Sequence, residues 1–206
     1  MTPLQPSLFG FGEPAVDERA AREHIPLDDA SWIDVTRGWL LGADTLLADL
    51  VDGDRVEWHQ GRRWMYERVL DDPRLSHRYA RGDALPHPAL AMVGERLELE
   101  LGLPLVGPAL NYYRDGNDSV AWHADRELRE LVDTRVAILT LGACRPFLVR
   151  PTGGGASRNL APASGDLLVM GGACQQRWEH AVPKRARAGP RISCSWRWTR
   201  QPPEPA

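Results

Sequence analysis

The pattern of apolar positions predicts two helices in the first half of the chain. Over residues 43–51 and 88–101, apolar side chains recur every three or four positions, which places them on one face of a helix. Pro88 suits the first turn of the second helix, and Gly102 can cap its carboxyl end. Residues 1–30 are rich in Pro, Asp, Glu and Ala without a sustained period, and we expect an extended or poorly ordered arm there.

The pattern changes after position 105. Short apolar or alternating runs then follow one another, separated by turns rich in Gly, Asn, Asp and Pro. Strands at this spacing predict a sandwich or barrel preceded by helices, so the expected fold class is α+β, mainly β. We expect one domain over residues 31–200, with a helical part to about 105, a β part from about 106, and a tail at 201–206. The seven runs are VGPALNYY, VAWHA, RVAILTL, RPFLVR, DLLVM, RWEHAV and RISCSWRW.

Composition narrows the class of protein. The 206 residues are 43% hydrophobic and 26% charged, which is typical of a folded domain rather than a disordered chain. No apolar run is long enough to span a membrane, and the N-terminus lacks the basic and apolar regions of a secretory signal. Three cysteines without a CxxC pair argue against a disulfide scaffold or a cysteine-based zinc site. We therefore expect a cytoplasmic protein, and we take a monomer as the default state.

Charge is distributed unevenly. The net charge is −3, yet residues 145–200 hold 10 basic residues against the two acidic residues Asp166 and Glu179. Such a segment can attract a polyanion while the whole molecule stays acidic. A solvated, arginine-rich surface would give the same count.

Three residues in the β part have the chemistry of a metal site. His123 and Asp125 are two positions apart, so on a strand their side chains point to the same side. With His180 they make two histidines and one carboxylate, the set that suits non-haem Fe(II) and leaves three coordination positions open. The alternatives are a half-exposed histidine bonded to a nearby carboxylate and a satisfied core histidine.

Two arginines in the last run indicate an anion site. Arg191 and Arg197 are six residues apart, so both project from the same face of a strand. A buried arginine needs an anionic partner, and a dicarboxylate held bidentately is a natural one. Asn111 and Tyr113, two apart on another strand, could supply neutral donors to the same ligand. The alternative is an edge strand with a solvated outer face.

The order of these motifs resembles the AlkB-type dioxygenases. NYY is followed by HADRE, LTLGACRPF, a lone histidine and PRISCSWR, over roughly residues 68–198. The resemblance implies a double-stranded β-helix, or jelly-roll, and a reaction that uses Fe(II), 2-oxoglutarate and dioxygen. It is closest to the subgroup that acts on duplex DNA, because of the LTLGACRPF stretch and the basic segment HAVPKRARAGPR.

The resemblance implies a role for each matching residue. His123, Asp125 and His180 match the iron ligands. Arg191 matches the partner of the far carboxylate of 2-oxoglutarate. The other cosubstrate positions are Asn111, Tyr113, Ser195 and Arg197, and the base-contacting positions are Tyr79, which would stack, and Glu127. Ser193 is a departure, since the family often has Asn there.

The activity implied is oxidative dealkylation of N-alkylated bases in DNA, with release of formaldehyde, succinate and CO2. The target atom is inaccessible in a stacked helix, so the nucleotide must be flipped into the site. We expect Lys184, Arg185 and Arg187 to grip phosphates beside it, the alternative being a solvated loop. Tyr79 could instead be a core tyrosine. Alternative functions are the same chemistry on RNA, nucleotide or protein, and a catalytically silent nucleic-acid-binding protein.

Overall fold

The computed structural model describes residues 10–52, 54–65, 67–128, 130–131 and 133–200. Its central element is a large antiparallel sheet of seven strands. Its strands lie in the order β2-β3-β13-β10-β15-β8-β7, with β10 paired along its length to both β13 and β15. The strands are β2 (Arg22–Pro26), β3 (Ser31–Thr36), β7 (Leu75–Arg78), β8 (Val106–Tyr113), β10 (Asp133–Gly142), β13 (Leu167–Gly172) and β15 (Arg191–Arg200).

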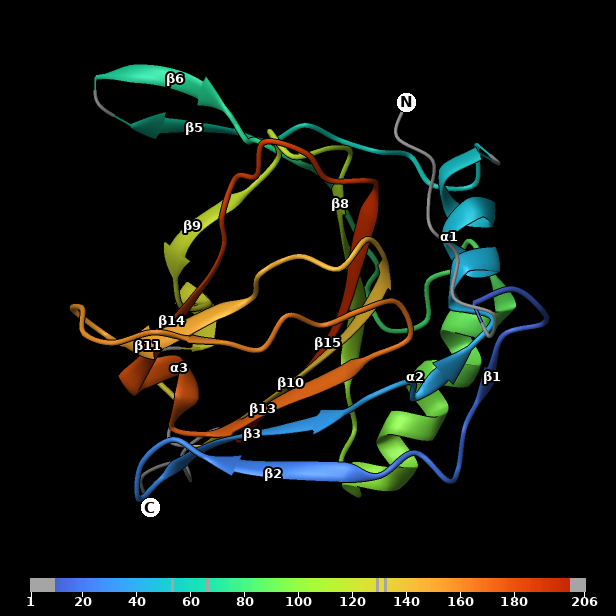
Figure 1. Ribbon diagram of the computed structural model, residues 1–206, viewed down its shortest axis with the longest axis horizontal. Coiled ribbons are helices and arrows are strands. Elements are labelled where there is room, and N and C mark those ends of the chain that lie inside the picture. Colours follow the sequence, from blue (N-terminus) through green and yellow to red (C-terminus); the bar gives the residue numbers. More distant parts are fainter. Residues whose placement is uncertain (1–9, 53, 66, 129, 132, 201–206) are drawn as a thin grey trace.

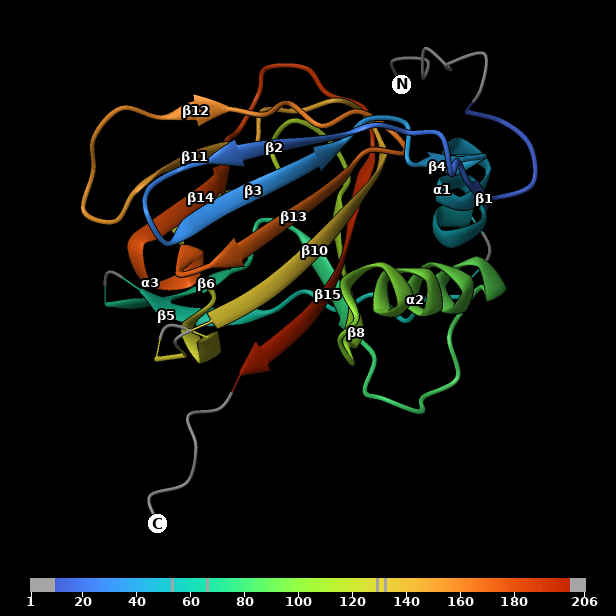
Figure 2. The same cartoon turned by 90° about the horizontal axis from the view of Figure 1, so that it is seen from below.

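A smaller antiparallel sheet covers one face of the large one. Its order is β12-β11-β14-β9, and Figures 1 and 2 show it opposite the large sheet, with the two helices of the N-terminal half on the other side. Two facing antiparallel sheets with helices packed outside confirm the expected mainly β jelly-roll. The strands are β9 (Val120–His123), β11 (Leu148–Pro151), β12 (Arg158–Asn159) and β14 (Trp178–Val182).

Alternation along the central strands separates two cores. On β10, Ala137 and Leu139 pack toward the helices, whereas Val136 and Ile138 pack between the sheets. Side chains of a strand point alternately to its two faces, and here both faces are covered, so the middle of β10, Val136 to Leu139, is apolar without a break. The large sheet is therefore the wall between the helical layer and the space that holds the polar residues described below.

The two long helices are α1 (Ala43–Asp52) and α2 (Pro88–Leu101), as the apolar spacing predicts. The Nδ1 atom of His87 accepts a hydrogen bond from the Ala89 amide at 3.1 Å, and Gly102 ends α2 in the left-handed conformation. None of the helices in the described ranges is both long and apolar enough to cross a membrane.

Two small two-stranded sheets and two short helical turns complete the description. Figure 1 shows the hairpin of β5 and β6 projecting beyond the edge of the two large sheets, above β9. The remaining elements are β1 (Ala15–Val16), β4 (Leu40–Leu41), β5 (Arg62–Met65), β6 (Arg68–Asp71), η1 (Arg126–Leu128) and α3 (Cys174–Arg177).

The expected arm at residues 1–30 requires correction. Residues 1–9 lie outside the described residues, but β2 pairs along its length with β3 and forms an edge of the large sheet. The sequence pattern of β2 is polar because an edge strand exposes most of its side chains, so no alternation was visible. The boundary near position 105 is also too late, since β3 joins the large sheet by pairing with β13. The tail at 201–206 lies outside the described residues.

Two leucines of α2 test the packing of the helical layer. Leu97 is fully buried, whereas Leu99 is 74% exposed. We expect Leu97→Ala to lower the free energy of unfolding by about 2–5 kcal/mol, because it removes buried methyl groups and leaves a cavity. Leu99→Ala makes the same chemical change at the surface and should shift it by less than about 0.5 kcal/mol. Denaturant titration of both variants measures the two changes in the free energy of unfolding. Equal changes would contradict the assigned orientation of α2.

Candidate active site

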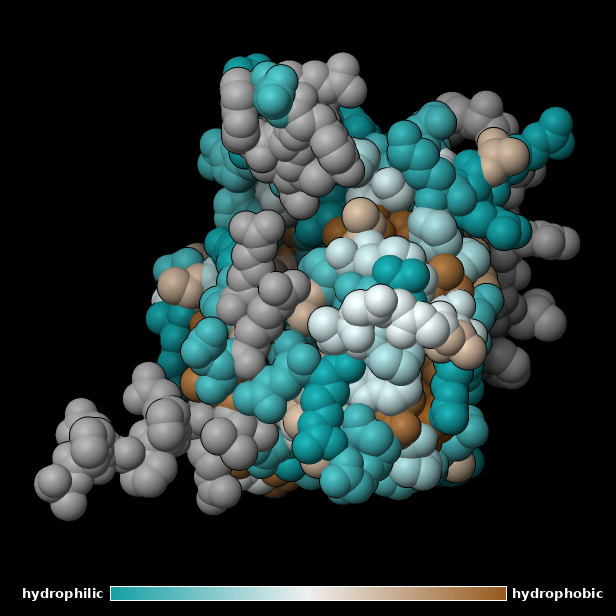
Figure 3. All heavy atoms as spheres, turned by 90° about the vertical axis from the view of Figure 1, so that its left-hand side faces the viewer, coloured by the Kyte–Doolittle hydropathy of each residue, from teal (hydrophilic) through white to brown (hydrophobic). Residues whose placement is uncertain are grey.

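A cavity of about 690 Å³ lies between the two sheets. Strands β8, β9, β14 and β15 contribute to its walls, and the residues after β9 contribute to its rim. Figure 3 views the molecule from the side of the hairpin and β9, and this face is predominantly hydrophilic. The cavity is polar inside: it brings together the predicted residues Asn111, Tyr113, His123, Asp125, Glu127, His180, Ser195 and Arg197.

His123 and His180 face each other across neighbouring strands. They are directly paired between β9 and β14, and their ring centroids are 4.3 Å apart. The Nδ1 atom of His123 lies 2.9 Å from the Ala121 carbonyl oxygen and 3.1 Å from that of His180, so it carries the proton and leaves Nε2 as the atom with a free lone pair. Burial lowers the pKa of His123, and burial with the neighbouring His123 lowers the pKa of His180 to about 3. Both imidazoles are therefore neutral at neutral pH, as metal ligands must be.

Asp125 reaches the same cavity from a different place than expected. Strand β9 ends at His123, and Asp125 begins the turn into η1, where its amide donates to Gln175 Oε1 at 2.9 Å. Its Oδ2 accepts a hydrogen bond from Arg197 Nε at 2.8 Å. Burial alone would raise the pKa of Asp125, but the Arg197 guanidinium with its hydrogen bond and the neighbouring histidines together outweigh burial and lower that pKa. The carboxylate is therefore charged.

The donor atoms of His123, Asp125 and His180 are of the types that bind an iron ion. As they lie, no three His, Cys, Asp or Glu side chains in the described ranges converge as a ready set of metal ligands. Yet Asp125 Oδ1 accepts no hydrogen bond from the described residues, so it can bind a metal while Oδ2 stays with Arg197. His180 Nδ1 is buried and likewise finds no partner among them. Neutral imidazole and carboxylate donors are what non-haem Fe(II) takes.

A second group of predicted residues lies on β8 and β15, and of these Asn111 and Tyr113 line the cavity whereas Arg191 does not. Arg191 is fully buried. In the register of β15 with β8, Arg191 lies opposite Tyr113 and Ser193 lies opposite Asn111. The Arg191 guanidinium donates to Thr140 Oγ1 at 3.2 Å, but its Nε and Nη1 have no partner among the described residues. Burial lowers the pKa of Arg191 to about 10, so it remains a cation at neutral pH. A buried cation with free donors is a site for an anion.

The two residues expected to contact a base, Glu127 and Tyr79, lie in different places. Glu127 lines the cavity from η1 and is held by Arg78 Nη1 at 3.4 Å. Tyr79 requires correction: it is absent from the cavity walls and packs against the helical core, with its ring centroid 4.5 Å from that of His77. Alternation along β7 gives the reason, because Ser76 and Arg78 face the cavity and the odd positions face away.

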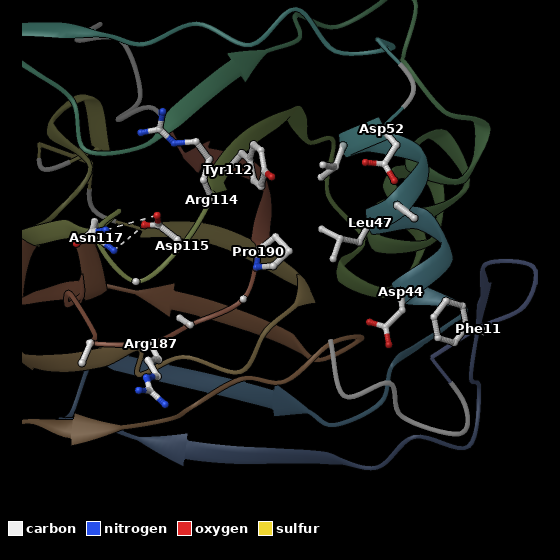
Figure 4. Close-up of a pocket in the computed structure, with 16 residues that line it drawn as sticks. Phe11, Asp44, Leu47, Asp52, Tyr112, Arg114, Asp115, Asn117, Arg187 and Pro190 are labelled. Carbon is white, nitrogen blue, oxygen red and sulfur yellow. Dashed lines mark hydrogen bonds between the residues drawn. The ribbon is translucent and has the colours of Figure 1, made fainter. Parts of the chain in front are cut away.

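The basic turn lies outside this cavity. Lys184, Arg185 and Arg187 are exposed on the connection from β14 to β15, and the Arg185 amide donates to the Gly116 carbonyl at 2.8 Å. Arg187 lines a different cavity of about 720 Å³, across from α1 (Figure 4). The buried Arg145 holds the start of this connection, donating to the carbonyl of Pro183 at 2.8 Å. The turn is therefore fixed at its base and free at its charged tips.

Three further residues of the cavity were not predicted as site residues, although Phe147 ends the LTLGACRPF stretch. Phe147 stacks on His180 with ring centroids 5.3 Å apart. Trp122 lies at the wall, with the Arg150 guanidinium carbon 4.0 Å from its ring centroid. Arg74, just before β7, donates through Nε to Asn111 Oδ1 at 2.9 Å. Trp122 could have been suggested by its place next to His123 on β9, and Phe147 by its place in the LTLGACRPF stretch. No motif of the sequence analysis includes Arg74.

Comparison with known families identifies the class of protein. The model of the 2OG-Fe(II) oxygenase superfamily matches residues 58–200. This chain belongs to that superfamily, a class of dioxygenases that use Fe(II) and 2-oxoglutarate. The match spans the cavity and all of its predicted residues.

Several relatives carry AlkB names, which confirms the resemblance. The human "Alpha-ketoglutarate-dependent dioxygenase alkB homolog 3" is 31% identical over 176 residues, covering 75% of this chain and 61% of the relative. The bovine protein of that name is 35% identical over 150 residues, covering 68% and 49%. The bovine "DNA oxidative demethylase ALKBH2" is 31% identical over 153 residues, covering 68% and 54%. The chain thus spans about half to three fifths of the length of these relatives.

Solved structures share the fold at lower identity. A prolyl hydroxylase from Trichoplax adhaerens aligns with a TM-score of 0.61 at 13% identity, over 81% of this chain and 82% of that one. A prolyl-4-hydroxylase from Pseudomonas putida aligns with a TM-score of 0.51 at 17% identity, over 78% and 86%. They show a common fold.

Metal binding tests the three donors directly. We expect His180→Ala to weaken binding of Mn(II) or Co(II) by more than about 100-fold, because losing a ligand costs more than losing one of its supporting hydrogen bonds. His24→Ala is the matched control, since His24 lies on β2 with 58% of its side chain exposed. Calorimetric titration gives both affinities, and circular dichroism checks folding. Unchanged metal affinity in a folded His180→Ala protein would remove His180 from the ligand set.

Proposed function

We propose that this protein is a DNA dealkylase, which removes alkyl groups from N-alkylated bases with Fe(II) and 2-oxoglutarate. The observation that carries the proposal is that His123, Asp125 and His180 line one and the same cavity, and that Glu127 lines it too. Membership of the oxygenase superfamily supports the chemistry. Kinship with a protein named DNA oxidative demethylase supports the substrate.

The proposed division of labour follows the positions of the side chains. His123 Nε2, a nitrogen of His180 and Asp125 Oδ1 would hold the iron. Arg197 keeps the Asp125 carboxylate ionised and fixed through its 2.8 Å hydrogen bond, which preserves a charged ligand. The free donors of Arg191 would take the far carboxylate of 2-oxoglutarate.

When bound, the iron with 2-oxoglutarate and dioxygen supplies the oxidation of an N-methyl carbon, with succinate and CO2 as coproducts. The hydroxymethyl group left on the base then falls away as formaldehyde. The protein's part is to orient the base and to exclude competing reactions. Phe147 stacks on the neutral imidazole of His180 and supports that ligand from one side.

Base selection is assigned to Glu127 and Trp122. A methylated base that carries a positive charge would be attracted by the Glu127 carboxylate, which is 53% exposed and therefore accessible. Trp122 offers the aromatic surface that Tyr79 does not, and its ring already contacts a guanidinium on one face. Methylation of a pairing nitrogen weakens base pairing, so flipping such a base into the cavity costs less than flipping a normal base.

Formaldehyde release is the decisive assay. We expect a methylated oligonucleotide to yield formaldehyde only when Fe(II) and 2-oxoglutarate are both present, because the oxidation needs both. His123→Ala is the control, and its activity should vanish since a ligand is lost. Single-stranded DNA, double-stranded DNA and RNA of one sequence are compared in parallel. Succinate formation without formaldehyde from any of them would refute nucleic-acid dealkylation and leave the oxygenase chemistry intact.

The basic turn makes a separate prediction about affinity. Replacing Lys184, Arg185 and Arg187 with Gln should reduce the slope of log K against log salt by up to about 3, because each phosphate contact contributes roughly 0.9. The control is Arg19→Gln with Arg22→Gln, which removes positive charge at the β2 edge of the sheet. Fluorescence anisotropy at several salt concentrations measures both. An unchanged slope in the turn variant would place the phosphate contacts elsewhere.

A further inference from the structure

Arg74 is a residue of the cavity whose guanidinium is only partly hydrogen-bonded. It precedes β7, is half-buried, and lines the cavity with the two histidines. Its Nε donates to Asn111 Oδ1 at 2.9 Å, and its guanidinium carbon is 6.0 Å from the centroid of the Tyr113 ring. Its Nη1 is buried and has no hydrogen-bond partner among the described residues.

The bond to Asn111 fixes the orientation of that amide. A guanidinium has donors and no acceptor, so the atom of Asn111 that faces Arg74 must be the oxygen. The amide NH2 is therefore turned away from Arg74, on a side chain that lines the cavity. Without Arg74 the amide could flip and present its oxygen instead, which would repel a carboxylate.

The free Nη1 indicates an anion that comes from outside the protein. A buried cationic donor without a partner is costly, and a carboxylate oxygen is its best partner. Arg191 has the same deficiency at Nε and Nη1, and its guanidinium carbon is 5.8 Å from the same Tyr113 ring. Arg145 also lies over that ring, at 5.4 Å, and its Nε has no partner among the described residues. Three incompletely bonded guanidinium groups around one tyrosine fit a ligand with two carboxylates, and Arg74 is the one of the three that lines the cavity.

We propose that Arg74 is a positioning residue for 2-oxoglutarate: through Nε it holds the Asn111 NH2 toward the cosubstrate, and through Nη1 it adds a hydrogen bond to a carboxylate. The inference rests on the assignment of Asn111 to the cosubstrate under the proposed function. A nucleic-acid phosphate is the other anion that could bind there. The buried position of Nη1 favours the smaller ligand, because a phosphate of the backbone stays at the exposed rim.

Arg78 provides a matched control on the same strand. It lines the same cavity, but its side chain is 69% exposed and pairs with Glu127 rather than Asn111. Arg74→Met and Arg78→Met remove the same charge from the same cavity. Only the first removes the bond that orients Asn111.

The test measures binding of 2-oxoglutarate to the Mn(II)-loaded protein by calorimetry, without nucleic acid. We expect Arg74→Met to weaken binding roughly 10- to 100-fold, as for the loss of hydrogen bonds to a charged group, and Arg78→Met to leave it unchanged. Affinity for Mn(II) itself should be unchanged in both. Unaltered 2-oxoglutarate affinity in Arg74→Met, with weaker oligonucleotide binding, would overturn the proposal in favour of a phosphate contact.

A double-mutant cycle separates positioning from general charge. If Arg74 acts through Asn111, then Arg74→Met in an Asn111→Ala background should cost clearly less than in the native protein, and additive losses would contradict this. Asn111→Asp leaves Arg74 in place and should also weaken 2-oxoglutarate binding, so it serves if Arg74→Met does not fold. Arg191→Met is the reference: if it too leaves binding unchanged, the proposed cosubstrate site is wrong, and not only the role of Arg74.

Discussion

Strand β15 is apolar on one face and polar on the other, and the arrangement of the cavity depends on this alternation. Ile192, Cys194 and Trp196 are buried among the helices. The alternate positions turn Arg191, Ser193, Ser195 and Arg197 to the inner face of the sheet. A shift of one residue in register would bury two guanidiniums in an apolar core, so pairing with β8 and β10 is strongly specified. The same register sets Arg191 opposite Tyr113 and Ser193 opposite Asn111.

Electrostatics then divides the cavity into a paired and an unpaired part. Asp125 and Arg197 neutralise each other, and the pKa of Asp125 is lowered as a result. Arg74 and Arg191 keep buried donors without partners among the described residues. Keeping such donors buried lowers stability, and an anionic ligand that satisfies them recovers that free energy as affinity. This arrangement agrees with a superfamily whose cosubstrate is a dicarboxylate.

The charged groups at the rim of the cavity are exposed to solvent, unlike those of its interior, and this suits a substrate site. Glu127 and Arg78 form an ion pair that is largely solvated, so either can exchange its partner at little cost. Lys184 and Arg185 lie on a connection whose backbone is anchored by Arg145 and by the bond from Arg185 to Gly116. Anchored backbone with free charged tips suits contacts that follow a phosphate chain without reading its sequence.

The sequence by itself determined α1, α2, most of the strands after position 105 and the identity of the chemistry. Apolar spacing predicts α2 at Pro88–Leu101, and even spacing puts Arg191 and Arg197 on one face of β15. It could not place Tyr79, because which face of β7 meets the cavity depends on pairing with β8 rather than on composition. Nor could it find Arg74, whose importance comes from a hydrogen bond across 37 positions of the chain. Local periodicity depends on neighbouring residues, whereas long-range pairing is decided only when the strands assemble into sheets and the sheets pack together.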